Sequence, residues 1–205
     1  MTDVEIKRGR GRPRAFNREA VLEHAMQAFW SAGYEGASVP LLAGAMGISV
    51  QSLYAAFGSK EALFREALDY YSRTVGGFGA RALEAESDAI RAVIRFLDEA
   101  AVNFARTTGT PGCMIATAAA EVAEPSLSAY ARQLRTDSVA RISARLKRGV
   151  QEGQMSAGFD CDHWAWYIAS VMLGMSVQAR DGATADVLHA VARIAAASIE
   201  ANRRG

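Results

Sequence analysis

The sequence predicts an all-α protein with about nine helices. Through most of the 205 residues, apolar side chains recur at steps of three and four, the spacing that places them on one face of a helix. Residues that favour helix ends stand at the boundaries of these segments, with Ser or Asp before the first turn and Gly after the last. With 50% hydrophobic and 22% charged residues, the composition is that of a globular protein, neither disordered nor embedded in a membrane.

The first 15 residues predict an extended basic arm. Six basic residues and no acidic one lie between Lys7 and Arg18, which leaves 17 basic against 22 acidic residues elsewhere, a net charge of −5. The sequence RGRP at residues 10–13 resembles the core of an AT-hook, in which arginines enter a narrow A·T minor groove. A generic basic tail that raises non-specific affinity is the alternative. The residues that we expect to contact DNA are Arg10, Arg12 and Arg14.

A first helix is predicted over residues 17–32, and Gly33 ends it. Its apolar residues are expected to pack against the two helices that follow. They are Val21, Leu22, Ala25, Phe29 and Trp30.

Residues 38–60 predict two short helices joined by a tight turn. Ser38 and Ser49 can each accept a hydrogen bond from a free N–H at a helix start, and Gly47 suits the left-handed conformation that ends a helix. The apolar positions of the two helices are Val39, Leu42, Ala43 and Met46, then Val50, Leu53 and Phe57. This pattern is that of a helix-turn-helix, whose second helix, here residues 49–57, can enter the major groove of DNA.

The outward side chains of this second helix are uncharged: Gln51, Ser52, Tyr54 and Ala55. A face that is merely solvated would usually carry Lys and Glu. Gln can pair with adenine, and Ser and Tyr can hold a phosphate. An ordinary pair of packed helices is the alternative interpretation.

Residues 16–63 resemble the DNA-binding domain of the TetR/AcrR family of bacterial transcriptional regulators. The resemblance covers about a quarter of the chain. It is carried by Ala28-Phe29-Trp30, Gly33-Tyr34, Ser38, Leu42-Ala43, Met46-Gly47-Ile48-Ser49, Leu53-Tyr54, Phe57 and Lys60-Glu61-Ala62-Leu63. It implies a three-helix DNA-binding domain, here residues 16–62, followed by a helical domain, residues 63–205, that binds an effector and dimerises.

The resemblance also assigns roles to single residues. It places Val50, Gln51, Ser52 and Ala55 toward bases or the groove, and Ser38, Tyr54 and Lys60 toward phosphates. The sequence departs from the family pattern at Pro40, where a polar residue often contacts the DNA backbone, and at the small Ala55 and Ala56. Specificity is therefore expected to depend on Gln51 and on the arm.

The remaining helices follow from periodicity. A fourth helix is predicted over residues 60–75, with an interruption or bend at the glycines of residues 76–79, and a fifth over residues 87–106. A short alanine-rich helix is expected to begin at Pro111 and run to Val122, and a long one continues from residue 127 to 146. The basic residues of the long helix are expected to form a solvated face. They are Arg132, Arg135, Arg141, Arg145, Lys147 and Arg148.

A gap among these alanine-rich helices would be a natural ligand cavity. The resemblance implies that a small molecule binds there and tilts the fourth helix. We expect a mostly apolar effector. The residues expected to line its cavity are Phe96, Phe104, Cys113, Met114, Tyr130 and Leu134.

Two final helices are predicted over residues 160–178 and 184–202, the first of them apolar on nearly all sides. The pair resembles the four-helix dimer interface of the TetR family, and a monomeric core is the alternative. The expected interface residues are Trp166, Met172, Leu173, Val177, Leu188, Val191, Ile194 and Ala195.

Other chemistry is weakly indicated. Cys113 at a helix start would have a lowered thiol pKa, so a redox- or electrophile-sensing regulator is one alternative function, and a non-specific architectural DNA-binding protein is another. Residues 160–163, DCDH, are better explained as a helix cap than as a metal site. The sequence contains no nucleophile elbow, phosphate loop or zinc-protease motif, so we expect neither an enzyme nor a cofactor.

The expected compartment is the cytoplasm, without a membrane partner. The N-terminus lacks the apolar core of a secretory signal, and the longest uncharged run, residues 164–179, is shorter than the roughly 20 residues that span a bilayer. Two cysteines, Cys113 and Cys161, are too few for a disulfide framework. The combined expectation is a homodimeric repressor that binds a pseudo-palindromic operator.

Overall fold

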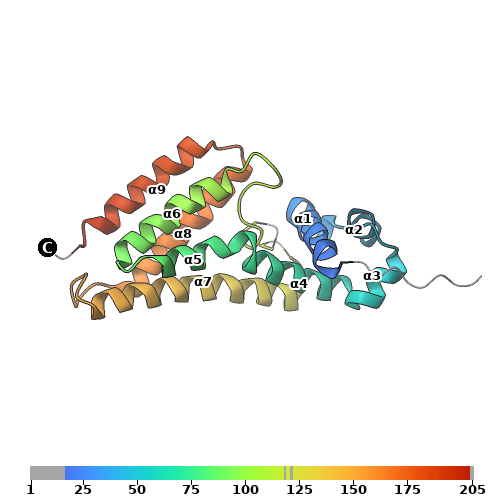
Figure 1. Cartoon of the computed structure of the whole chain (residues 1–205), viewed down its shortest axis with the longest axis horizontal. Helices are drawn as coiled ribbons and strands as arrows, with labels where there is room; N and C mark the ends of the chain where they lie inside the picture. The colour runs from blue at the N-terminus through green and yellow to red at the C-terminus, as the bar shows by residue number, and fades with distance from the viewer. Residues whose placement is uncertain (1–16, 118, 121, 204–205) are drawn as a thin grey trace, which may run out of the picture.

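A computed structural model describes residues 17–117, 119–120 and 122–203, and it confirms the all-α architecture (Figure 1). The described residues form nine α-helices and one short 3₁₀ helix, η1. In order they are α1 (Arg18–Gly36), α2 (Val39–Met46), α3 (Val50–Phe57), α4 (Lys60–Arg73), η1 (Val75–Gly77), α5 (Phe78–Ala85), α6 (Ala89–Phe104), α7 (Pro125–Gln151), α8 (Cys161–Arg180) and α9 (Ala185–Glu200).

The helices form two groups. Figure 1 shows α1, α2 and α3 gathered at one end and α6, α8 and α9 at the other, with α4, α5 and the long α7 running between them. The helices α5 and α7 both pack onto the second group, α5 against α6 and α7 against α8, and within that group α6 packs against α9. The helix α4 packs against α1 and α3 in the first group and against the long α7.

Each group has its own buried core. The first core contains Phe29, Trp30 and Phe64, and it also includes Met114 and Leu127 from the segment before α7 and the start of α7. The second is built from apolar residues of α5 to α9. Because Met114 and Leu127 complete the first core, a movement of the segment that precedes α7 would displace the side chains of α1 and α4 that pack against it.

The segment between α6 and α7 differs from expectation. No helix is present over the described part of residues 111–122, which forms turns. Gly109 and Gly112 both adopt positive φ values, of +81° and +78°, and the backbone N–H of Cys113 donates to the Ser176 hydroxyl at 2.7 Å. The left-handed conformation of Gly112 is incompatible with a right-handed helix that starts at Pro111, in which φ is negative at every residue.

A helix that was not predicted, α5, begins at Phe78, within the glycine-containing segment of residues 76–79. Gly79 lies against the ring of Phe96, since a Cβ there would stand 2.5 Å from a ring carbon. The glycine thus allows α5 to approach α6 closely. Gly76 and Gly77 lie in η1 and interrupt the helical path, as predicted, but α5 begins at the next residue.

No single helix in the described part of the chain is both long and apolar enough to cross a membrane. The bent pair of α2 and α3 reaches that length and apolar character only when its two helices are counted together.

Candidate nucleic-acid interface and ligand cavity

The helices α2 and α3 meet at 91° through a three-residue turn. Ser38 caps α2 by accepting from the Leu41 N–H, and Ser49 caps α3 by accepting from the Ser52 N–H. Between them Gly47 adopts φ +66°, the left-handed conformation expected at this helix end. The crossing angle and turn are those of a helix-turn-helix.

The second helix of this pair presents an uncharged surface. Gln51 and Ala55 are exposed, and the Tyr54 side chain is 46% exposed although it is large and partly apolar. Val50 is also exposed, at the N-terminal end of the helix. On the opposite face Leu53 and Phe57 are buried, so the core fixes which side chains point outward.

Three predicted contact residues are engaged within the protein. The Ser52 hydroxyl is half-buried and lies 2.8 Å from the Ser49 hydroxyl. The ammonium group of Lys60 lies over the ring of Tyr34, 4.3 Å from its centroid. The hydroxyl of Ser38 caps its own helix. The arm residues Arg10, Arg12 and Arg14 lie outside the described part of the chain.

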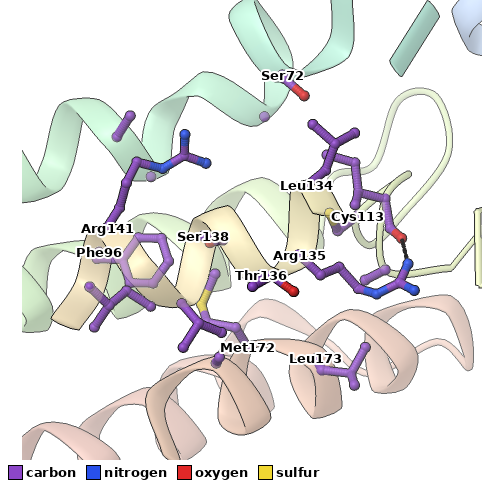
Figure 2. A pocket seen from close by; sticks show the side chains of 18 of the residues that line it. Ser72, Phe96, Cys113, Leu134, Arg135, Thr136, Ser138, Arg141, Met172 and Leu173 are labelled. Carbon is purple, nitrogen blue, oxygen red and sulfur yellow. Dashed lines mark hydrogen bonds between the residues drawn. The ribbon is translucent and has the colours of Figure 1, made fainter. Parts of the chain in front are cut away.

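A cavity of about 440 Å³ lies between α4, α5, α6, α7 and α8 (Figure 2). Four of the six residues expected there line it: Phe96, Phe104, Cys113 and Leu134. The structure places the other two elsewhere. Met114 is fully buried in the first core, and Tyr130 donates to the Asp69 carboxylate beneath the guanidinium of Arg65. Burial, together with the bond to Asp69, raises the pKa of Tyr130 to about 12.

The cavity lining also contains three arginines that were expected on a solvated face. Arg132, Arg135 and Arg141 all come from α7. Arg132 and Arg141 are exposed, as expected, and Arg135 is half-buried. Arg145 departs further from that expectation, because it is buried and donates to the backbone carbonyls of Glu86 and Ser87. The sequence identified these residues as basic, but only the packing of α7 shows which of them face inward.

The cavity is connected to the first group of helices through aromatic and hydrogen-bond contacts. Tyr71 of α4 lines the cavity and packs edge-on against Trp30 of α1, with centroids 5.0 Å apart. Burial raises the pKa of the Tyr71 hydroxyl well above its ordinary value, and the adjacent Cys113 adds to this effect. On the other side Arg180 of α8 donates to the Trp30 carbonyl at 3.0 Å, and the guanidinium of Arg106 lies over the indole ring.

The helices α8 and α9 expose apolar side chains. Trp166, Leu173, Val177, Val191 and Ile194 are all exposed, with Ile194 reaching 69%. Met172 is half-buried and also lines the cavity. Two residues expected at the same face, Leu188 and Ala195, are instead buried in the second core.

The potential metal ligands of residues 160–163 are used separately. Asp160 caps α8 and pairs with His163, Asp162 pairs with Lys147 at 2.8 Å, and Cys161 is buried. Among the residues that the structure describes, no group of three or more His, Cys, Asp or Glu side chains is arranged to hold a metal ion.

Similarity to known proteins agrees with this geometry. Residues 21–67 match the family model described as bacterial regulatory proteins, tetR family. Residues 89–195 match the model of the tetracyclin repressor-like C-terminal domain. The two matches correspond to the two groups of helices.

Individual relatives extend over nearly the whole chain. The HTH-type transcriptional repressor ComR of Escherichia coli K12 is 31% identical over 91% of this chain and 90% of its own length. The HTH-type transcriptional repressor BdcR of the same organism is 30% identical over 98% of each chain.

A solved structure is similar in fold and sequence. It is that of a cysteine-substituted variant of the TetR-family regulator CifR, complexed with 26-base-pair double-stranded operator DNA. It superposes with a TM-score of 0.88 at 37% identity, covering 92% of this chain and 99% of that chain. The chain therefore belongs to the TetR family of bacterial transcriptional regulators, which is not a family of enzymes.

Proposed function

We propose that this protein is a homodimeric repressor that binds a pseudo-palindromic operator and is released by a small effector. The observation that supports this most strongly is the uncharged, exposed face of α3, held by a rigid helix-turn-helix at one end of the molecule. ComR and BdcR are repressors by name, and the CifR variant is bound to operator DNA. In a dimer, two such helices would enter successive major grooves about one helical turn apart.

The effector would act through α4. Tyr71 and Ser72, near the end of this helix, line the cavity, and the start of the helix follows α3 directly. A ligand that fills the cavity would change the position of Tyr71 and, through it, of Trp30. Such a ligand shifts the balance between two spacings of the α3 helices only if it binds one spacing better than the other.

This function implies a division of the chain into the arm, residues 1–15, the DNA-binding domain, residues 16–62, and an effector-binding and dimerisation domain, residues 63–205. The exposed apolar residues of α8 and α9 support the dimerisation role, since apolar patches of this kind commonly mark interfaces.

The proposal is tested by selecting bound sequences from a random duplex library with the purified full chain at near-physiological salt. An inverted repeat is the expected product. Featureless or merely A·T-rich DNA would instead support the architectural alternative and contradict sequence-specific repression.

Chemical modification of Cys113 is a second candidate signal. Its half-buried side chain lines the cavity, and its thiol lies next to the Tyr71 hydroxyl on α4. If the protein senses electrophiles, iodoacetamide should release the operator from wild type and from Cys161→Ala, but not from Cys113→Ala. Release from all three proteins would exclude this role for Cys113.

A further inference from the structure

The charged side chains that line the cavity are of one sign. Its lining includes the cationic Arg132, Arg135 and Arg141, and no Asp or Glu side chain belongs to it among the described residues. The nearest acids along the helices are used elsewhere. Asp137 accepts from Gln133 at 2.8 Å, and Asp69 accepts from Tyr130. The cavity is therefore positively charged without a compensating carboxylate in its described lining.

Of the three arginines in the lining, Arg132 and Arg141 are exposed and Arg135 is half-buried. Figure 2 shows its side chain running along the cavity, with a guanidinium N–H directed at a backbone oxygen, the carbonyl of Ile115 at 3.1 Å. No other hydrogen bond and no ion pair of Arg135 is present within the part of the chain that the structure describes. Burial lowers the pKa of Arg135, and the neighbouring Arg132 lowers it further, which shows that the site disfavours its charge.

A guanidinium carries five N–H donors in a planar fork that matches a carboxylate. A half-buried cation with one neutral partner leaves most of these donors available, and an anion that paired with them would recover the cost of burial. A neutral apolar ligand would displace the water that still solvates the guanidinium and would supply no hydrogen-bond acceptor in its place.

The rest of the cavity is apolar. Phe78 packs against both Phe96 and Phe104, with centroids 6.2 and 5.9 Å apart, and Met172 and Leu173 extend the apolar surface from α8. A volume of about 440 Å³ lies in the range of sites for small organic molecules. The cavity thus combines an aromatic and aliphatic wall with a cation.

From this combination we infer that the cavity binds an amphipathic anion, an apolar body that carries one carboxylate-like group paired with Arg135. This inference rests on the proposed function, because it names the chemical class of the effector expected at that site. It also changes the expectation of a mostly apolar effector, since the charged group becomes the main determinant of selectivity.

The test compares each carboxylate with its neutral methyl ester, which keeps the same apolar body. Decanoate and naphthoate, each beside its methyl ester, are titrated into the full-length protein by calorimetry, with no DNA present. The carboxylates should bind at least about 10-fold more tightly than their esters, as expected for a hydrogen bond to a charged partner in a half-buried site. This comparison on the wild-type protein needs no variant that could misfold.

Variants then assign the preference to one residue. Arg135→Met keeps the aliphatic stem and should reduce the acid-to-ester ratio to about one, and Arg135→Lys should restore part of it. Arg148→Met is the matched control, because Arg148 is exposed on the same helix and lies outside the cavity lining. The control should keep the wild-type ratio.

The outcomes separate this inference from the proposed function. Equal affinities for acid and ester, or no binding of either carboxylate at millimolar concentration, would overturn the inference and leave operator recognition untouched. Tight binding of a carboxylate that does not release the selected operator would instead contradict the effector response, while the assignment of the ligand class would stand.

Discussion

At the scale of single residues, Gln51 is the side chain on α3 best suited to distinguish bases. It is exposed, and its amide can pair with adenine. We predict that Gln51→Ala lowers affinity for the selected operator by roughly 1 to 3 kcal/mol with little change on random DNA. Fluorescence anisotropy on both duplexes measures this difference. Gln133→Ala, an exposed glutamine on α7, is the control that should change neither affinity.

An equal loss on the two duplexes would show that Gln51 contacts only the DNA backbone. The neighbouring Ser52 is less suited to specify a base in this conformation, because its hydroxyl lies against Ser49.

Residues whose role is local were predictable from sequence, and residues whose role depends on packing were not. Ser38, Ser49 and Gly47 occupy the helix ends expected of them, because a cap or a positive φ is determined by a few adjacent positions. Arg135 and Arg145 were expected at a solvated face. Their burial depends on which side of α7 meets α8 and the segment at Glu86, and basic residues spread around a helix do not reveal that side.

At the scale of elements, the turn between α2 and α3 sets the angle of the second helix. We predict that Gly47→Ala destabilises the protein by about 1 kcal/mol, because φ is +66° there and an L side chain strains that conformation even though no atom lies within 4 Å of the added Cβ. Thermal unfolding measures the change.

Gly44→Ala is the matched control for this turn. Gly44 lies inside α2, and its added Cβ also meets nothing within 4 Å. That substitution should stabilise the protein by roughly 0.5 to 1 kcal/mol, because alanine favours a helix interior. Similar effects of the two substitutions would mean that backbone conformation does not determine stability at the turn.

Periodicity predicted the long helices but misplaced a short one. The alanine-rich segment from Pro111 has helical propensity, yet Gly112 and the bond from Cys113 to Ser176 hold it in turns. In the reverse case, the glycines of residues 76–79 suggested only a bend, but Gly79 permits the close approach to Phe96 that stabilises α5 against α6. In both cases an interaction distant in sequence overrides the local preference.

At the scale of the whole molecule, charge is concentrated at the N-terminus. Residues 1–14 contain five Lys or Arg residues after Glu5, whereas the chain as a whole has a net charge of only +1. Removing residues 1–14 should weaken binding to all duplexes and flatten the dependence of log affinity on log salt by roughly 0.9 for each phosphate that the arm neutralises in the full chain. Binding isotherms at several salt concentrations test this. An unchanged slope would show that the arm does not contact the duplex.

The proposed dimer makes a second prediction at this scale, because an isologous interface presents each substituted residue twice. Ile194 is 69% exposed on α9, and a carboxylate buried there in both subunits would lack a partner. Ile194→Asp should therefore weaken dimerisation by about 100-fold or more and reduce operator affinity with it. Analytical ultracentrifugation measures the first effect.

Val102→Asp, at an apolar residue of α6 that is 59% exposed, is the control expected to leave the dimer intact. If Ile194→Asp remained dimeric while Val102→Asp dissociated, the interface would lie on α6 and the spacing of the two α3 helices would have to be set by a different pair of surfaces.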